Sequence, residues 1–425
     1  MKLTPLENWI MLRSGIPERK RGLLEEYQLD RIRETVRYTA SHSRFYKEQF
    51  KKIDADSIRS LKDFQALPFT SPQQIRDRSL DFLCVPQSEI KRIVTLKSSG
   101  TSGNEKRIYF TEEDLNLTVD FFQWGMSCLT DSTDRVLVLL PGNSYGSIGD
   151  LLKKALSKTE IPCFVSGVMT NVQETAQCIV ENGITCIVGI PIQIMQLARM
   201  GNVAFKRIRK VLLSTDYVPE TLISELTEYG CRVFTHYGMT EMGYGGGVEC
   251  EALDGYHMRE ADLYFEIVDS VTSRPVPDGQ WGEVVVTTLT RKAMPLIRYR
   301  TGDIAAFSPV PCPCGTFLKT MKRVRGRLGN ELRIGDESLS LAELDEIILP
   351  FREVMDYRVR FSSGNRIDIE IAAVGNGLCC DKITLSVTDY IHEKFGCEIN
   401  PLIRVSLNGE PKKILNSMMK RTVRG

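Results

Sequence analysis

The sequence predicts an α/β fold, in which a large N-terminal α/β body carries an added antiparallel β piece and is followed by a small C-terminal α+β domain. Between residues 135 and 235, short apolar β-rich runs alternate with helical stretches, which is typical of a largely parallel, doubly wound sheet. Strand pairs joined by turn-rich segments follow, and they favour an antiparallel addition. A chain of 425 residues exceeds one compact core, and its texture changes near residue 327, so we expect domains 1–326 and 327–425.

The expected elements follow from local patterns. Residues 20–50 show a helical periodicity of apolar side chains, and Thr111-Glu-Glu-Asp114 has the capping-box pattern ahead of an apolar helix that runs to about Cys128. Buried strands are expected at 135–140, 185–190, 210–214 and 232–235, with helices at 146–156, 171–181 and 219–229. Antiparallel strands are expected at 264–269 and 282–289, and beyond residue 327 a strand–helix pair, a strand pair near 356–373, a helix near 380–395 and a basic tail.

The charge balance narrows the classes of partner. The chain holds 55 basic and 54 acidic residues, for a formal net charge of +1, and contains no long basic block, which argues against nucleic acid as the main partner. It contains no uncharged apolar stretch of about 18 residues, so no membrane span is expected. Twelve cysteines, without a signal-peptide pattern at the N-terminus, indicate a reducing compartment, and we expect a cytoplasmic protein.

Residues 97–107 read Lys-Ser-Ser-Gly-Thr-Ser-Gly-Asn-Glu-Lys-Arg and combine hydroxyl side chains, glycines and basic groups. Glycines let backbone N–H groups approach a ligand, hydroxyls add donors and Lys106 adds charge, so the loop is suited to phosphate oxygens. The spacing of a Walker loop is absent. The alternative is a flexible Ser/Gly linker, but the run lies between two strand-like segments, 92–96 and 108–110, and we predict that it covers phosphates.

A second motif, His236-Tyr-Gly-Met-Thr-Glu241, follows an expected strand. Tyr237 offers an aromatic face for a purine, and Gly238 allows close approach of the backbone. Thr240 offers a hydroxyl at the distance of an α-phosphate, and the Glu241 carboxylate is suited to Mg²⁺. The alternative is a strand end that leads into a turn with incidental polar residues.

The third motif, Arg298-Tyr-Arg-Thr-Gly-Asp303, ends in an aspartate. One carboxylate accepts hydrogen bonds from two donors, so Asp303 is suited to both hydroxyls of a ribose. An aspartate in a turn is more often a local cap, and it is the neighbouring motifs that favour the ribose role.

Together with Gly326-Arg327, and with Tyr46, Ser60-Leu-Lys-Asp63 and Leu67-Pro-Phe-Thr70 ahead of the loop, these motifs make the chain resemble the adenylate-forming acyl ligase superfamily. Within it, the chain is most similar to the phenylacetate–coenzyme A ligase-like branch. The resemblance implies that the protein uses ATP and AMP, Mg²⁺ and coenzyme A, and that the small C-terminal domain is mobile about a hinge. The expected reaction is that of an AMP-forming acid–thiol ligase.

The resemblance also assigns residues. It implies a nucleotide site at Ser98, Ser99, Gly100, Thr101, Ser102, Gly103, Lys106, Ser214, Thr215, Asp216, His236, Tyr237, Gly238, Met239, Thr240, Asp303 and Arg327. Thr240, Glu241 and Lys420 are the expected catalytic residues, with Glu241 as the Mg²⁺ ligand, and Tyr145, Gly146, Pro191 and Gly243 the expected acyl pocket. The branch usually has Gly-Ala-Glu where this chain has Ser214-Thr-Asp216. The glycine run after Glu241 either leaves space near the reacting carboxylate or is a simple loop.

Four further residues form a candidate metal set: Cys250, His257, Cys312 and Cys314. Three thiolates and one imidazole match a closed structural zinc site, although Cys-x-Cys is tighter than the usual gap. The branch that the chain resembles carries a similar set. The alternative is a group of reduced free thiols in loops beside a surface histidine.

Two positions depart from the superfamily pattern. Gly329 stands where a hinge aspartate is usual, and Met418 falls where the superfamily has a lysine that reaches the substrate carboxylate. Methionine donates no charged hydrogen bond. Lys412, Lys413 and Lys420 are nearby replacements, and we expect Lys420 to act.

The expected function is ATP-dependent activation of a small carboxylic acid, expected to be aromatic, through an acyl-adenylate, followed by transfer to coenzyme A. One alternative is an adenylating enzyme with another acceptor. The other is a nucleotide-binding accessory protein without ligase activity. Neither nucleic acid nor a membrane is an expected partner, and a homodimer is left open.

Overall fold

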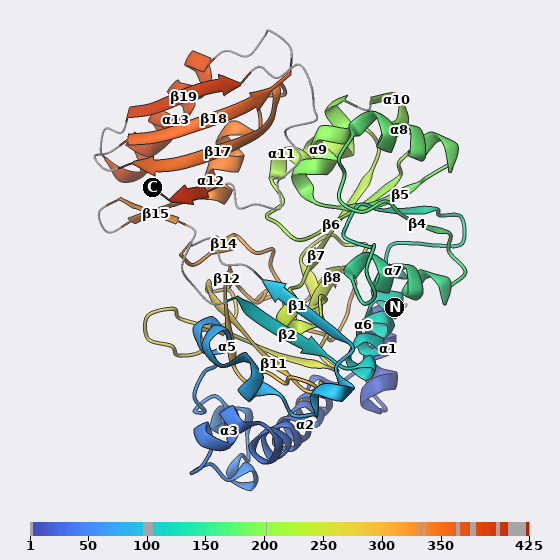
Figure 1. Cartoon of the computed structure of the whole chain (residues 1–425), viewed down its shortest axis with the longest axis vertical. Coiled ribbons are helices and arrows are strands. Elements are labelled where there is room, and N and C mark those ends of the chain that lie inside the picture. The colour runs from blue at the N-terminus through green and yellow to red at the C-terminus, as the bar shows by residue number, and fades with distance from the viewer. Residues whose placement is uncertain are drawn as a thin grey trace. The chain divides into compact units, whose positions relative to one another are not determined.

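The computed structural model describes residues 3–96, 105–200, 202–329, 331–334, 337–362, 366–374, 380–396, 400–406 and 422–424. The chain forms two compact units (Figure 1). Unit 1 takes its residues from Met1–Thr133, Pro141–Cys163 and Phe234–Val324, and unit 2 from Asp134–Leu140, Phe164–Val233 and Arg325–Gly425. The predicted boundary at 326–327 lies close to residue 325, where the chain enters unit 2 for the last time, and it stays a prediction.

Most helices in the described part of unit 1 begin at a polar side chain that caps the first turn. The helices are α1 (Pro5–Ser14), α2 (Arg21–His42), α3 (Arg44–Gln49), α4 (Leu61–Phe64), α5 (Pro72–Arg78), α6 (Glu112–Met126) and α7 (Ile148–Ser157). The predicted capping box is confirmed, because the Thr111 side chain accepts from the Asp114 amide and Asp114 accepts from the Thr111 amide. Two orphan amides at the start of α6 are thereby satisfied. Predicted helix 146–156 corresponds to α7.

The strands of unit 1 form antiparallel sheets. Strands β1 (Arg92–Leu96) and β2 (Lys106–Phe110) pair with each other. Strands β10 (Leu263–Val268), β11 (Gly282–Thr288) and β12 (Tyr299–Ala305) form a second sheet in that order. Strands β13 (Thr320–Met321), β9 (Tyr256–Met258), β8 (Gly247–Glu249) and β7 (Arg232–Tyr237) are successive antiparallel neighbours. The predicted antiparallel strands 264–269 and 282–289 are confirmed as β10 and β11.

Unit 2 contains the parallel sheet, in the order β6-β5-β3-β4. Its strands are β3 (Val136–Val138), β4 (Cys163–Val165), β5 (Cys186–Gly189) and β6 (Lys210–Leu213), and its helices are α8 (Val172–Glu181), α9 (Pro191–Met200), α10 (Asn202–Phe205) and α11 (Glu220–Glu228). Strands β3, β5 and β6 are parallel neighbours and are buried almost throughout. Their apolar runs are the signature from which an α/β fold is predicted, and that fold class is confirmed.

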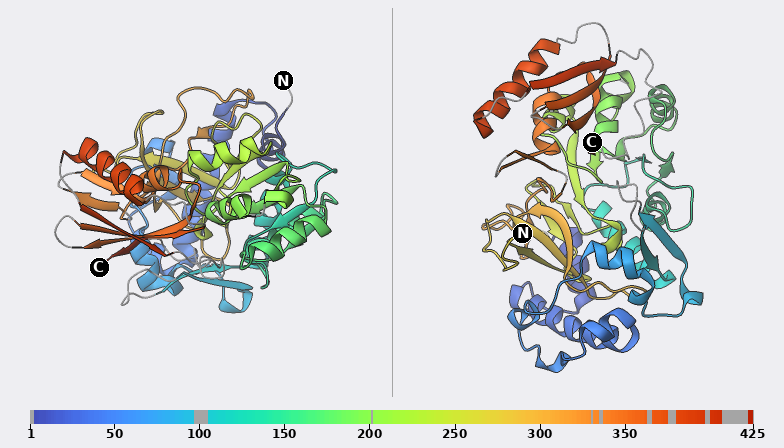
Figure 2. Two further views of the ribbon diagram at one scale, coloured as in Figure 1. Left: turned by 90° about the horizontal axis from the view of Figure 1, so that it is seen from above. Right: turned by 60° about the vertical axis from the view of Figure 1, so that its left-hand side comes forward.

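The C-terminal part of unit 2 is a smaller α+β arrangement. Its elements are β14 (Gly326–Arg327), β15 (Glu331–Ile334), β16 (Glu337–Ser340), α12 (Leu341–Ile348), β17 (Val354–Ser362), β18 (Arg366–Ala373), α13 (Cys380–Phe395), β19 (Asn400–Ser406) and β20 (Thr422–Arg424). The sheet order is β19-β18-β17-β20, and α13 lies along one face of this sheet (Figure 2). The predicted strand pair near 356–373 and helix near 380–395 are confirmed.

A buried arginine joins this C-terminal part to the helices of the parallel sheet inside unit 2. The Arg199 guanidinium pairs with Glu225, with an N–O distance of 2.5 Å, and donates to the carbonyl oxygens of Leu349 at 2.7 Å and Val354 at 2.5 Å. One guanidinium carries enough donors to satisfy several carbonyls at once. This contact helps to hold the residues beyond 325 in the same compact unit as residues 164–233.

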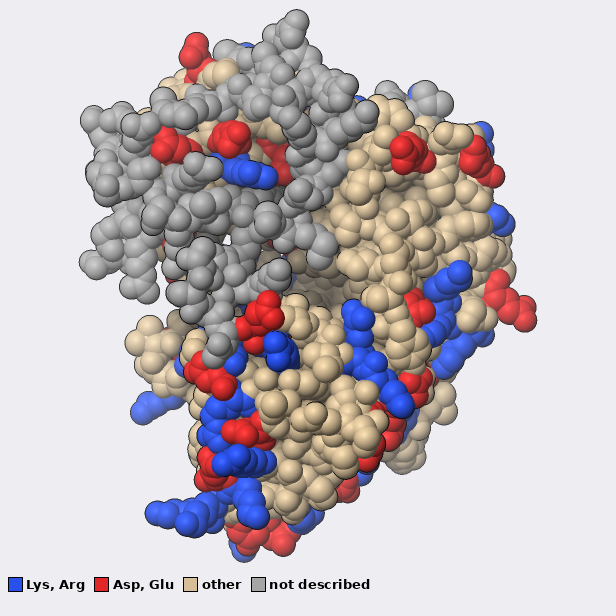
Figure 3. Space-filling model, in the orientation of Figure 1, with Lys and Arg blue, Asp and Glu red and all other residues tan. Residues whose placement is uncertain are grey.

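Among the described residues, no helix combines the length and the apolar character needed to cross a bilayer. On the described part of the face drawn in Figure 3, lysines and arginines are interspersed with aspartates and glutamates. That face therefore carries charges of both signs over unit 1.

Candidate active site

The second and third sequence motifs meet at one place in unit 1. Strand β7 ends at Tyr237, and β12 carries Asp303. The Tyr237 hydroxyl donates to the Asp303 carboxylate at 3.0 Å, and the Asp303 amide donates to the Thr301 hydroxyl oxygen at 3.0 Å. The residues predicted to hold the adenine and the ribose are thus neighbours, although they stand 66 positions apart.

The loop after Tyr237 is closed tightly. Residues Thr240–Met242 form a single 3₁₀ turn, and Gly243 ends it in the left-handed region with φ of 76°. A Cβ on Gly245 would collide with the Phe121 ring, and one on Gly246 with the Met242 sulfur. These glycines pack closely against their neighbours and leave no room for a side chain. The two interpretations of the run, space near a reacting carboxylate or a simple loop, both stay predictions.

Three buried polar groups come together beside this loop. Lys106 from β2 forms an ion pair with Glu241. The Tyr299 hydroxyl, at the start of β12, lies 3.0 Å from Glu241 Oε1 and 3.2 Å from Lys106 Nζ. The exposed fractions are 8% for Lys106, 1% for Glu241 and 0% for Tyr299. The ammonium and the carboxylate are therefore held out of water, and they provide one positive and one negative group for a charged ligand.

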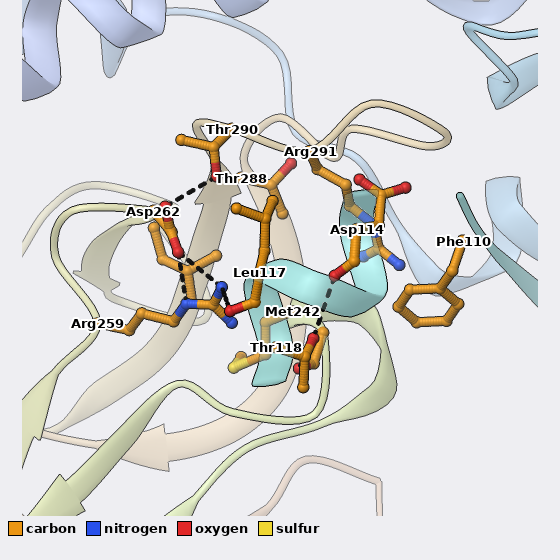
Figure 4. Close-up of a pocket in the computed structure, with 12 residues that line it drawn as sticks. Phe110, Asp114, Leu117, Thr118, Met242, Arg259, Asp262, Thr288, Thr290 and Arg291 are labelled. Carbon is orange, nitrogen blue, oxygen red and sulfur yellow. Dashed lines mark hydrogen bonds and ion pairs between the residues drawn. The ribbon is translucent and has the colours of Figure 1, made fainter. Parts of the chain in front are cut away.

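A small cavity of about 20 Å³ underlies the loop (Figure 4). At its wall Arg259 pairs with Asp262 at 2.6 Å, and the Arg259 guanidinium also donates to the Leu117 carbonyl at 2.8 Å. The Thr118 hydroxyl donates to the Gly243 carbonyl at 3.0 Å, and Arg291 donates to the Glu241 carbonyl at 2.5 Å. The last two bonds hold the backbone of the loop at Gly243 and Glu241.

Burial shapes the charges around this cavity. It lowers the pKa of Arg259, and Asp262 opposes the effect. Burial alone would raise the pKa of Asp262, but Arg259 and Arg13 outweigh it and hold that pKa below the usual value. Each member of the Arg259–Asp262 pair therefore favours the charged form of the other, as expected for charges that compensate each other in a low-dielectric interior.

His236, which was expected at the nucleotide site, lies in a different environment. Its ring centre is 6.5 Å from that of Phe121 and 6.3 Å from that of Phe122. Burial lowers its pKa to about 4, so the imidazole is neutral at neutral pH. Its side chain therefore packs with aromatic residues, and its role in nucleotide binding stays a prediction.

The other predicted nucleotide residues divide between the units and the part of the chain that is not described. Ser214, Thr215 and Asp216 follow β6 in unit 2, and Thr215 has a positive φ of 80°. Arg327 lies on β14, also in unit 2. The residues from Ser98 to Gly103, together with Met418 and Lys420, lie outside the described residues. Their assignments stay predictions.

The predicted acyl-pocket residues have varied surroundings. Tyr145 is 47% exposed, donates to the Glu112 carboxylate and lies 4.2 Å from Lys154 Nζ, measured from its ring centre. The Gly146 carbonyl accepts from the Tyr244 hydroxyl at 3.2 Å, and Gly243 lines the cavity of Figure 4. Pro191 is buried at the start of α9 in unit 2.

The predicted metal ligands do converge. The ligand atoms of Cys250, His257, Cys312 and Cys314 all lie within 4.8 Å of one another. The Cys250 and Cys312 sulfurs are 3.7 Å apart, and the Cys314 sulfur is 3.6 Å from His257 Nε2. His257 is 1% exposed, so the alternative of a surface histidine does not hold. Burial lowers the pKa of His257 to about 4, so its imidazole is neutral at neutral pH. One ring nitrogen then has a lone pair that can bind a cation.

Sequence reasoning missed four side chains of the site: Arg259, Asp262, Arg291 and Tyr299. Charged residues in a loop-rich segment are usually exposed, and nothing in their spacing indicates burial. Tyr299 belongs to a motif in which only Asp303 was assigned a role. Its position directly ahead of Arg-Thr-Gly-Asp was the one signal available.

Comparisons with known proteins identify the family of the chain and several curated relatives. The model of the family described as AMP-binding enzyme matches residues 48–290, more than half of the chain. A phenylacetate-coenzyme A ligase of Thermus thermophilus is 28% identical over 80% of this chain and 78% of that protein. The namesake from Pseudomonas putida is 27% identical over 82% of this chain and 81% of that protein. These matches confirm the predicted resemblance and the predicted class of AMP-forming acid–thiol ligase.

The fold is also that of a solved ligase. The structure of a 2-hydroxyisobutyryl-CoA ligase in complex with 2-HIB-AMP superposes with a TM-score of 0.80 at 18% identity, covering 94% of this chain and 89% of that one. At 18% identity, this structural similarity supports the fold alone.

Proposed function

The chain belongs to the AMP-binding enzyme family, and we propose that it activates a small, aromatic carboxylic acid with ATP and Mg²⁺ before transfer to coenzyme A. The observation that carries the proposal is that the same two segments, β12 and the end of β7 with the turn after it, carry both the Tyr237–Asp303 pair and the Glu241 and Tyr299 side chains that contact Lys106. A site for a nucleoside triphosphate needs an aromatic face for the base and a carboxylate for the ribose. It also needs an ammonium for phosphate and a carboxylate for Mg²⁺.

The side chains of the site suggest how the reaction proceeds. Asp303 holds the ribose and Tyr237 covers the base, so that the α-phosphate lies near the Thr240 hydroxyl. The substrate carboxylate then attacks that phosphorus in line with the leaving pyrophosphate. Lys106 would neutralise phosphate charge, and the Glu241 carboxylate would hold Mg²⁺, which would supply further charge neutralisation at the phosphates. Catalysis by these residues is mainly positioning and charge neutralisation.

The names of the curated relatives support an aromatic acid and coenzyme A as substrates, since both relatives are phenylacetate-coenzyme A ligases. An acceptor other than coenzyme A is the second candidate. Pyrophosphate release in the presence of a panel of acids tests the first step, and thioester formation tests the acceptor. Release of pyrophosphate without a thioester would favour the other acceptor. The absence of pyrophosphate release with every acid of the panel would favour an accessory protein.

We further propose that Cys250, His257, Cys312 and Cys314 hold a structural zinc ion. Ligands arranged tetrahedrally around zinc, with Zn–S bonds of about 2.3 Å and Zn–N bonds of about 2.0–2.1 Å, stand about 3.8 Å apart for two sulfurs and about 3.6 Å for sulfur and nitrogen. The corresponding distances here are 3.7 and 3.6 Å. Burial raises the pKa of Cys250, and a divalent cation would reverse that effect.

The cysteines bear on the compartment in which the protein works. A reducing, cytoplasmic compartment is supported by the ten described cysteines, all of which are free thiols. A homodimer stays a prediction, to be tested by the oligomeric state in solution.

Replacing Asp303 by alanine is expected to weaken AMP binding by more than about a hundredfold, because two hydrogen bonds to a charged group are lost at about 1.5–3 kcal/mol each. Isothermal titration calorimetry measures the effect. Asp269→Ala is the matched control: this aspartate accepts from two amides in the turn after β10 and has no predicted ligand role. Equal AMP affinity in Asp303→Ala and the wild type would refute the ribose assignment.

Lys420→Ala is expected to reduce acid-dependent pyrophosphate exchange by about a hundredfold or more, the scale of losing a charged group that acts in the transition state. Lys412→Ala and Lys413→Ala should retain exchange and serve as controls. Exchange that is equal in all three variants would mean that the tail supplies no catalytic lysine, and a wild type without exchange would favour the accessory protein.

A further inference from the structure

The Tyr299 hydroxyl is shared between the two charged groups of the site. A phenol has one hydrogen to donate and lone pairs to accept with, so Tyr299 donates to Glu241 at 3.0 Å and accepts from the Lys106 ammonium at 3.2 Å. Lys106 and Glu241 also pair directly with each other. The three side chains come from β2, the 3₁₀ turn and β12, so no local constraint of sequence brings them together.

The direct ion pair competes with the expected ligand. In the proposed reaction Lys106 needs a phosphate oxygen and Glu241 needs Mg²⁺, but each now neutralises the other. Separating a buried pair leaves two uncompensated charges, which is strongly unfavourable. The pair can therefore open only when an anion and a cation arrive together, as they do in MgATP. AMP has neither the outer phosphates nor a need for Mg²⁺, and it leaves the pair closed.

We propose that Tyr299 is a positioning residue that allows the Lys106–Glu241 pair to open for MgATP. When the pair separates, the hydroxyl still donates to Glu241 and still accepts from Lys106, so each charged group keeps one protein partner in the open state. Without the hydroxyl, Glu241 and Lys106 each lose that protein partner in the open state. The closed ion pair is then favoured over the open state. This inference rests on the proposed function and adds to it a residue that distinguishes ATP from AMP.

The alternative is that Tyr299 is a core side chain whose hydroxyl merely requires a partner, as buried tyrosines usually do. The alternative predicts that loss of the hydroxyl affects stability, or every nucleotide, equally. Our proposal predicts an effect on MgATP alone.

The test is calorimetry of Tyr299→Phe with MgATP and, separately, with AMP, in the absence of acid. MgATP should bind about tenfold more weakly, the scale of one lost hydrogen bond to a charged group, while AMP affinity is unchanged. AMP binding also reports that the variant is folded. A parallel loss of both affinities, or unchanged MgATP affinity, overturns the inference. A wild type that binds no MgATP overturns the inference and the proposed function together.

Tyr46→Phe is the matched control. Tyr46 is also fully buried, and its hydroxyl makes two hydrogen bonds, with Thr70 Oγ1 at 3.0 Å and from the Ile297 amide at 2.9 Å. It lacks any contact with Lys106 or Glu241 among the described hydrogen bonds, so both nucleotide affinities should be retained. A double-mutant cycle with Lys106→Gln completes the design: the two losses of MgATP affinity should not add, since they remove the same arrangement. Additive losses contradict the proposal.

Discussion

Removal of zinc from the cluster of Cys250, His257, Cys312 and Cys314 is expected to lower the melting temperature by more than about 10 °C, because metal binding is coupled to folding and each kcal/mol is worth a few degrees in a chain of this size. Cys250 follows β8 and His257 lies on β9, and β8 pairs with β7 at Tyr237. The metal would join the 312–314 turn to the strands that carry the nucleotide loop.

Thermal unfolding with and without a chelator, together with elemental analysis of the purified protein, measures this effect. Cys312→Ser should lose zinc and melt at the lower temperature. Cys84→Ser is the matched control, because Cys84 is a buried thiol of unit 1 whose sulfur contacts only a carbonyl oxygen among the described hydrogen bonds. Purified wild type without zinc, or a melting temperature that is insensitive to chelation, would contradict the proposal.

Several parts of this molecule follow from local sequence alone. The Thr111–Asp114 capping box is a four-residue pattern, and the strands β3, β5 and β6 are continuous apolar runs. The metal cluster could be predicted because cysteine and histidine are few and their chemistry is specific. In each case the signal lies within a short segment or in the residue types themselves.

Other parts depend on contacts that no local pattern encodes. Arg13 pairs with Asp262 across 249 positions, and both charges would be expected at the surface. Arg199 connects the C-terminal part to the helices of the parallel sheet by donating to backbone carbonyl oxygens. Every residue has a carbonyl oxygen, so this contact cannot be predicted from the residue types. The shared hydroxyl of Tyr299 is of the same kind, because only the fold places it between Lys106 and Glu241.

Arg298→Met is expected to destabilise the protein by about 3–5 kcal/mol, the scale of breaking a buried ion pair. Arg298 is 1% exposed and makes two bonds to Glu266, of 2.9 and 3.1 Å, and its guanidinium also donates to the Leu67 carbonyl. Its backbone adopts the left-handed region, with φ of 47°, which is unfavourable for a residue with a Cβ. We expect the contacts of the guanidinium to stabilise this conformation at the residue that precedes Tyr299.

The cost of Arg298→Met should arise from the glutamate that remains. Glu266 is 3% exposed, and burial raises its pKa even with Arg298 present. Without the guanidinium the folded state should hold a proton on Glu266 more tightly than the unfolded state does. Stability of the variant should then be greatest at low pH and fall as the pH rises through the pKa of the folded state.

Urea denaturation at mildly acidic and mildly alkaline pH measures both effects. The double variant Arg298→Met/Glu266→Leu should recover most of the lost stability and lose the dependence on pH, because no unpaired charge is left. Arg352→Met is the control: its pair with Glu228 is exposed, with side-chain exposures of 68% and 64%, so the change should cost no more than about 1 kcal/mol. A single variant that is as stable as the wild type, or a double variant that is less stable than the single one, would show that the pair is not what holds Arg298 in place.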